Sequence, residues 1–305
     1  MKLLLTSIKR HLATELFHRA GSFAWLGGVV ALMALLPQQA DAHGELLIRI
    51  AETTKKIEAA TNNAQLYLDR GELYREDKNW AAAKADYDHA AVLDPNLATV
   101  DFCRAKMLDD SGEFESARAL FDKILSGNPT DGEAFVGRAR VLLKLNQRPA
   151  AIEDFQSGLQ WLPKPKMEYF LELAQAMAAE GKPEDALRVL DSGIAKFGPL
   201  IPLQTLAVEL ELGQKNRSAA VLRLDTIIER AFRKEDWLAK RGDVLFTAGR
   251  LAEAKKSFEE ALAAISILPW RLQQGPAMQK LQSHVHSALD KMAAPTFSLN
   301  AKNEN

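Results

Sequence analysis

At 305 residues, with 47% hydrophobic and 26% charged side chains, the chain is long enough for one large domain or two ordinary ones and has the composition of a globular protein. Its formal net charge of −1 supplies no clustered basic excess, which argues against nucleic acid as a partner. The single cysteine, Cys103, excludes an internal disulfide, and only 12 prolines and 17 glycines occur, which favours helix over strand.

The first 42 residues have the pattern of an export signal. Lys2, Lys9 and Arg10 precede an apolar run at residues 23–36, and Ala40-Asp41-Ala42 has the small-x-small form of a cleavage site. This run is shorter than the roughly 20 apolar residues that span a bilayer. We therefore expect cleavage after Ala42 and a periplasmic or secreted protein without a stable membrane span. An uncleaved N-terminal segment that anchors the chain in the membrane is the alternative.

Residues 43–63 are expected to form an N-terminal capping helix. Five apolar residues approximate a helical stripe, namely Leu46, Leu47, Ile50, Ala51 and Ile57, and the polar cluster that ends at Asn63 is typical of a turn. In an oxidising compartment a lone thiol is best kept away from solvent, so we expect Cys103, further along the chain, to be buried.

A period of 34 residues follows. Pro95 recurs as Pro129 and again as Pro163, and the residues before each proline also recur at fixed positions. The first copy has a small residue, a second small residue, an aromatic and a third small residue before its proline, namely Gly71, Ala83, Tyr87, Ala90 and Pro95. The equivalents in the next two copies are Ala105, Ala117, Phe121, Ile124 and Pro129, then Ala139, Ala151, Phe155, Gly158 and Pro163.

This pattern resembles the tetratricopeptide repeat, whose motif has small residues at positions 8, 20 and 27, an aromatic at 24 and proline at 32. Residues 167–199 form a fourth copy, residues 200–234 a degenerate fifth, and Gly242, Ala254, Phe258 and Ala261 mark a clear sixth. The resemblance covers residues 64–268. It implies an all-α fold, a right-handed α-solenoid of about six helix-turn-helix repeats with capping helices at both ends.

The turn between the two helices of a repeat is expected at Gly112, Asn146, Gly181 and Gly249, because glycine and asparagine relieve strain at a helix C-terminus. Residues 269–293 are expected to form a C-terminal capping helix, since their apolar residues recur at spacings of three and four. Residues 294–305 show no apolar periodicity and are expected to be a disordered tail.

Candidate chemistry is sparse. No G-x-S-x-G, Walker A, G-x-G-x-x-G or H-E-x-x-H motif occurs, so the sequence indicates a protein that is not an enzyme and holds no cofactor. His284 and His286 would point roughly 200° apart on a helix, which argues against a shared metal. His43 would begin the mature chain and offer an amine and an imidazole to copper. A periplasmic ligand- or metal-binding protein that uses His43 or an inter-helix pocket is therefore the alternative function.

The resemblance instead implies a protein-interaction scaffold that binds a peptide or helix of a partner in a concave groove lined by the first helix of each repeat. Leu68 and Glu72 replace the lysine and asparagine with which chaperone-binding members clamp a C-terminal carboxylate, which argues against that subtype. The partner-binding residues that the family positions predict are Gln65, Leu68, Glu72, Arg75, Glu76, Phe102, Lys106, Asp109, Arg140, Leu143 and Lys144.

Overall fold

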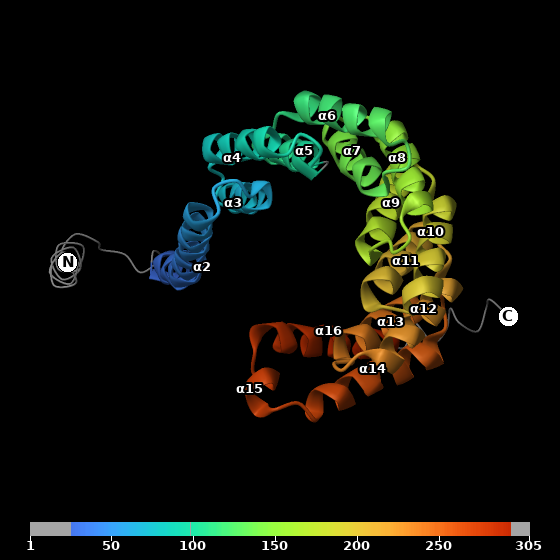
Figure 1. The fold of residues 1–305 in the computed structure, drawn as a ribbon. Helices are drawn as coiled ribbons and strands as arrows, with labels where there is room; N and C mark the ends of the chain where they lie inside the picture. Colours follow the sequence, from blue (N-terminus) through green and yellow to red (C-terminus); the bar gives the residue numbers. More distant parts are fainter. Residues whose placement is uncertain (1–25, 98, 294–305) are drawn as a thin grey trace, which may run out of the picture. The chain divides into compact units, whose positions relative to one another are not determined.

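The computed structural model describes residues 26–97 and 99–293, and their side chains from residue 43 onward. The described residues form fifteen α-helices and no strand, which confirms the all-α prediction (Figure 1). In chain order the helices are α2 Leu26–Ala59, α3 Ala64–Glu76, α4 Trp80–Leu93, α5 Thr99–Ser111, α6 Phe114–Gly127, α7 Gly132–Lys144, α8 Arg148–Trp161, α9 Met167–Ala179, α10 Pro183–Phe197, α11 Ile201–Gly213, α12 Arg217–Arg230, α13 Glu235–Thr247, α14 Leu251–Ser266, α15 Trp270–Gln273 and α16 Pro276–Ala293.

The chain divides into two compact units, Met1–Ser111 and Gly112–Asn305. In the first unit, α3 packs against α2 and α4, and α5 packs against α4. In the second unit, each helix from α6 to α13 packs against the helix that follows it in sequence, and α14 packs against α16. Helices thus contact mainly their neighbours in sequence, as in a tetratricopeptide solenoid. The predicted second repeat, α5 and α6, spans the boundary between the units.

The N-terminal capping helix begins earlier than expected from the sequence. The helix that we predicted to begin near residue 43 begins at Leu26 and continues to Ala59. Ile50 and Ile57 are buried, as the apolar stripe predicted, whereas Leu47 and Ala51 of the same stripe are exposed. Most of the expected export signal, residues 1–25, lies outside the described residues. Among the helices that are described, none is long and apolar enough to cross a membrane.

A left-handed residue occurs in the turn inside every helix pair. Gly112, Asn146, Gly181 and Gly249 have φ angles of +89°, +59°, +74° and +75°, which confirms the four predicted turns. Lys78 and Lys215 adopt the same conformation with φ of +58° and +61°. These six positions follow one another at spacings of 34 or 35 residues. The degenerate fifth copy, which contains Lys215, therefore keeps the turn even though its sequence motif is weak.

The two helices of a pair approach closely at the small residues of the motif. A Cβ added to Gly71 would lie 2.5 Å from Cε1 of Tyr87, and one added to Gly242 would lie 2.6 Å from Cε1 of Phe258. Both rings are fully buried. Because glycine leaves this space free, the aromatic ring of the second helix packs directly on the backbone of the first.

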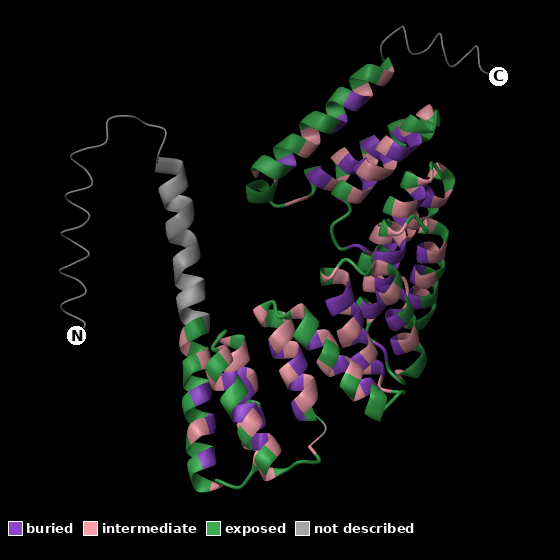
Figure 2. Cartoon of the chain, turned by 90° about the horizontal axis from the view of Figure 1, so that it is seen from above, coloured by how far each residue is buried: buried purple, intermediate pink, exposed green. Residues whose placement is uncertain are grey.

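The second helices end as predicted, and buried apolar side chains continue through each unit (Figure 2). Helices α4, α6 and α8 end two residues before Pro95, Pro129 and Pro163. At the C-terminal end, α16 buries Met278 and Val285 against the core, while Leu281, Leu289 and Met292 are partly buried there. Helix α16 therefore covers the last helix pair, which is the role that we expected of a capping helix.

Gly242→Ala tests the close helix approach. The added methyl group would overlap the ring of Phe258, which is enclosed by core residues and cannot move freely. We expect the free energy of unfolding to fall by about 1–3 kcal/mol, the usual effect of overpacking. Gly213→Ala is the matched control, because Gly213 lies in a helix with no atom within 4 Å of the added Cβ. It should stabilise the protein by about 0.5–1 kcal/mol in urea unfolding. Equal effects of the two substitutions would contradict the packing argument.

Candidate functional site

A set of arginines bridges successive helices in both units. Arg138 on α7 donates from Nε and Nη2 to the two carboxylate oxygens of Asp154 on α8, at 2.7 and 2.8 Å. Its Nη1 donates to Asp122 on α6, at 2.7 Å. Hydrogen bonds to Asp154, opposed by burial and aided by Asp122, raise the pKa of Arg138 above its usual value. One guanidinium thus joins three consecutive helices.

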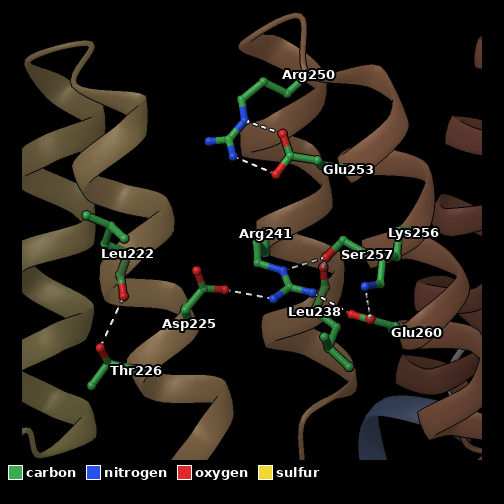
Figure 3. Close-up of polar contacts among 10 residues, drawn as sticks. All are labelled: Leu222, Asp225, Thr226, Leu238, Arg241, Arg250, Glu253, Lys256, Ser257 and Glu260. Carbon is green, nitrogen blue, oxygen red and sulfur yellow. Dashed lines mark hydrogen bonds and ion pairs between the residues drawn. The ribbon is translucent and has the colours of Figure 1, made fainter.

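The same arrangement recurs at Arg70 and Arg241. Arg70 makes two 2.7 Å hydrogen bonds to the buried Asp86. Arg241 donates to Asp225, Ser257 and Glu260 from three different nitrogens, and Figure 3 shows these contacts converging on one guanidinium. Each arginine directly precedes the first small residue of its repeat. The bridges are structural, because their polar groups are directed at the protein's own helices rather than at solvent.

These arginine bridges were not predicted from the sequence, although a signal for them was present. Arg70, Arg104 and Arg138 recur with the 34-residue period, and an aspartate lies 16 residues after Arg70 and Arg138. An aspartate also lies 16 residues before Arg104, and the two side chains form a 2.6 Å hydrogen bond.

Glu72, one of the predicted partner-binding residues, instead organises a network between α3 and α5. It accepts hydrogen bonds from Arg75 at 3.1 Å, from Lys106 at 2.8 Å and from the hydroxyl of Tyr87 at 2.7 Å. Burial by itself would raise the pKa of Glu72, but the hydrogen bonds from Arg75, Lys106 and Tyr87 lower it to about 2. Glu72 is therefore ionised at neutral pH, and its carboxylate oxygens already accept hydrogen bonds from three side chains of the protein.

Asp110 and Cys103 also lie close to Glu72 and Arg75 in the first unit. Arg75 forms an ion pair with Asp110 on α5 as well as with Glu72. Cys103 is buried, as predicted, and burial together with the nearby Glu72 carboxylate raises the pKa of its thiol to about 12. A thiol with this pKa is not a nucleophile at neutral pH. We call Glu72, Arg75, Tyr87, Lys106 and Asp110 the α3–α5 network.

The other predicted residues of the first unit have different environments. Leu68 is only 5% exposed and belongs to the core, so it is removed from the candidate surface. Gln65 and Glu76 are exposed, with Gln65 donating to Asp69 and Glu76 paired with Arg49 at 3.5 Å. The last two, Phe102 and Asp109, are half-buried and engaged with neighbouring groups.

In the second unit the structure brings the predicted Arg140 beside an acidic side chain and an aromatic ring. Arg140 donates from Nε and Nη2 to the two oxygens of Glu172 on α9, each at 2.8 Å. Its guanidinium carbon lies 5.4 Å from the ring centroid of Tyr169, whose hydroxyl donates to Glu133 at 2.7 Å. The hydrogen bonds to Glu172, opposed by burial, raise the pKa of Arg140 above its usual value.

Leu143 and Lys144 lie one turn further along α7. Leu143 is partly buried against the core, and Lys144 places its ammonium 5.4 Å from the ring centroid of Phe114 while remaining exposed. We refer to the surface formed by Glu133, Arg140, Leu143, Lys144, Tyr169 and Glu172 as the α7–α9 face. The sequence prediction did not include Tyr169 or Glu172, because its candidate residues came only from the first three copies and these two lie in the fourth.

The histidines do not converge. His43 is exposed within α2, and its Nδ1 lies 3.1 Å from Asp77. His284 contacts Asp243 on α13 at 2.9 Å, and His286 is exposed on α16. Within the residues described, no group of three or more histidine, cysteine, aspartate or glutamate side chains is placed to hold a metal ion.

An open pocket of about 290 Å³ lies between α8, α9 and α10. Its lining mixes charged, polar and apolar residues, namely Gln156, Met177, Asp185, Arg188, Val189 and Ser192. Arg188 and Asp185 pair with each other within this lining. The pocket therefore offers little unpaired charge to a small ligand.

Comparison with known families identifies tetratricopeptide repeats. Family models for this repeat match residues 104–161, 168–192 and 238–265. The first stretch includes α6, α7 and α8, the second includes most of α9 and of α10, and the third includes most of α13 and nearly all of α14. All six residues of the α7–α9 face lie within the first two stretches. The matched stretches do not include α11 or α12, the pair that contains the degenerate copy.

Solved structures of low sequence identity share the fold. The C-terminal part of a TPR repeat-containing protein from Cytophaga hutchinsonii is 14% identical, with 74% of this chain and 93% of that chain covered and a TM-score of 0.59. The structure of pilF from Pseudomonas aeruginosa is 16% identical, with 72% of this chain and 97% of that chain covered and a TM-score of 0.52. Yeast Tom70 is 17% identical over 76% of this chain, which spans 45% of the Tom70 chain, with a TM-score of 0.51. At these identities the similarity shows the fold alone.

Glu72→Gln tests the α3–α5 network. The folded pKa of Glu72, about 2, lies below its ordinary value, so its ionised form stabilises the fold above about pH 4.5 and this stabilisation is lost as the pH falls toward 2. We expect the variant to lose about 1–3 kcal/mol of unfolding free energy at pH 7. In urea titrations its difference from the unsubstituted protein should shrink between pH 4.5 and pH 2. A constant difference over that interval would disprove the assignment, and Glu76→Gln, at an exposed site, should change stability by less than about 0.5 kcal/mol.

Proposed function

We propose that the chain is a non-catalytic scaffold whose α7–α9 face binds a peptide or helix of a partner protein. The observation that supports this most directly is the geometry of Arg140. Its side chain is 42% exposed and yet fixed by two hydrogen bonds to Glu172 and by the ring of Tyr169. A charged group that is already ordered loses little conformational entropy when a partner binds.

The chemistry of the face also limits the kind of segment that fits. Lys144 offers an exposed cation, and Leu143 next to it offers a small apolar surface. Glu133 and Glu172 are already satisfied by Tyr169 and Arg140. We therefore propose that the partner segment places an acidic side chain near Lys144 and Arg140 and an apolar side chain against Leu143. In the first unit, the buried Leu68 and the fully paired Glu72 argue against a clamp for a terminal carboxylate.

A charge swap separates binding from folding at this face. Arg140→Glu alone would leave two carboxylates facing each other, whereas Arg140→Glu combined with Glu172→Arg restores the ion pair in the opposite direction. We expect both variants to lose partner binding by about tenfold or more, while only the single variant loses stability. The measurement is photo-crosslinking in cells of the source organism from a reactive residue at position 147, which is exposed and leaves Lys144 in place, with thermal unfolding in parallel.

A crosslinker at Lys255, which is exposed on the second helix of the last pair, is the control. The product formed from position 147 should be missing from position 255 and strongly reduced in the swapped variant. If the swapped variant keeps the same crosslinked product at the same yield, the charge of Arg140 does not contribute to binding and the proposed face is wrong.

We further propose that the protein works in the periplasm or cell envelope. The support is the sequence of residues 1–42, with basic residues, an apolar run and the Ala40-Asp41-Ala42 motif. The protein recovered from the envelope fraction should begin at His43 in N-terminal sequencing, and Ala42→Arg should leave a longer species that retains Met1. Recovery of unsubstituted protein that keeps residues 1–42 and fractionates with membranes would favour the anchored alternative instead.

A further inference from the structure

The connections between helices in the second unit fall at two opposite edges. Neighbouring helices from α7 to α14 pack together and are joined by short connections, so they run antiparallel and successive connections alternate between edges (Figure 1). One edge carries the turns inside the pairs, at 112–113, 145–147, 180–182, 214–216 and 248–250. The other edge carries the connections that follow each pair, at 128–131, 162–166, 198–200, 231–234 and 267–275.

Exposed apolar side chains gather at the second of these edges. The large exposed hydrophobic residues of the second unit are Trp161, Leu200, Leu222, Phe232, Ile267, Trp270 and Leu272. All except Leu222 lie in a connection that follows a pair or directly beside one. Phe232 is fully exposed, Ile267 is 83% exposed and Trp270 is 71% exposed. The turns inside the pairs carry no exposed residue of this kind.

Three of the four connections after α8 are basic, and the fourth, 198–200, has no charged residue. The four contain Lys164, Lys166, Arg233, Lys234 and Arg271 and no aspartate or glutamate, although Arg233 is paired with the buried Glu235 at the start of α13. The turns inside the pairs of this unit mix both signs, with Glu113 and Glu180 against Lys182, Lys215 and Arg250. We call the four connections 162–166, 198–200, 231–234 and 267–275, together with Trp161, the apolar–basic edge.

We propose that the apolar–basic edge contacts an anionic lipid surface. Tryptophan and phenylalanine are favoured at the boundary between headgroups and acyl chains, and each basic side chain near an anionic leaflet adds attraction. The charge of the edge complements such a surface at three of the four connections after α8, and at 198–200 the edge presents the exposed Leu200 without a charged residue. The connection at 128–131, before α7, contains no large apolar residue and one aspartate, so the edge begins at Trp161.

The form of the edge favours lipid over a folded partner. Its apolar side chains are spread over four connections, with three of the six on 267–275. Protein interfaces instead bury their anchoring residues in fitted pockets. A fluid lipid surface accommodates separate protruding side chains without a complementary shape. The edge and the α7–α9 face have no residue in common, although Lys166 of the edge lies 5.6 Å from the ring centroid of Tyr169. A partner protein and a lipid surface therefore use different residues.

The test places an environment-sensitive fluorophore on the full chain at Gln274→Cys, in the edge, and at Ala248→Cys, in a turn of the opposite edge. Cys103 stays in place, because it is buried and burial raises the pKa of its thiol, and the unsubstituted protein should take up no label. With vesicles of phosphatidylcholine containing phosphatidylglycerol, the label at 274 should shift to shorter wavelength and become quenched by brominated acyl chains. The label at 248 should not respond. Residues 23–36 can bind vesicles on their own, and pure phosphatidylcholine vesicles measure that contribution.

Three double variants show which residues cause the lipid-dependent signal at position 274. Lys164→Glu with Lys234→Glu, in the edge, should weaken the lipid-dependent signal at 274 by about tenfold or more in apparent affinity. Lys182→Glu with Lys215→Glu changes the net charge equally at the opposite edge and should leave the signal unchanged. Phe232→Ser with Trp270→Ser should abolish quenching by brominated chains while circular dichroism shows an intact fold.

Other outcomes overturn the proposal. Equal responses at 248 and 274, or a response that is the same on phosphatidylcholine alone, would mean that the edge makes no contact of its own. A signal at 274 that grows with protein concentration in the absence of vesicles would assign the edge to a second copy of the chain. Binding of poly-glutamate that the edge variant weakens, without any response to vesicles, would assign it to an acidic protein.

Discussion

The close contact between a small residue on one helix and an aromatic ring on its neighbour is the constraint on which the remaining structure depends. Where Gly71 faces Tyr87 and Gly242 faces Phe258, even one added carbon would overlap the ring. The contact fixes the separation of the two helices and buries the apolar surface between them. Because each such contact involves only neighbouring helices, the fold extends along the chain by repetition rather than around one central core.

Charged side chains join successive helices to a greater extent than the sequence indicated. Arg138 joins α6, α7 and α8 through Asp122 and Asp154, and Glu72 gathers Arg75 and Lys106 between α3 and α5. A half-buried charge must be paired, and within a stack of helices the nearest opposite charge lies on the adjacent repeat. Many residues at groove positions therefore stabilise the stack. Only those with exposed area left after pairing, as Arg140 has, remain available to a partner.

The fold was predictable from the sequence because its determinants are small residues, aromatics and prolines at fixed spacing, and the helix pairs recur at that spacing. The turns were predictable only where glycine or asparagine occupies the left-handed position; Lys78 and Lys215 adopt it without any sequence signal, since neighbouring helices impose the geometry. The candidate face was less predictable. Family positions indicate which side of a helix is open, but the burial of Leu68 and the pairing of Glu72 depend on helices whose offset the motif does not specify.

The two edges of the second unit differ because the two kinds of connection are constrained differently. The turn inside a pair has two or three residues and needs a left-handed residue at one position, so it has little freedom to vary. A connection that follows a pair ranges from three residues at 198–200 to the longer stretch at 267–275, which includes α15. Neither backbone geometry nor core packing explains why exposed positions such as Phe232 and Trp270 are large and apolar. Burying an exposed apolar ring against a surface outside the chain removes it from water, and the basic residues beside these rings favour a surface of negative charge.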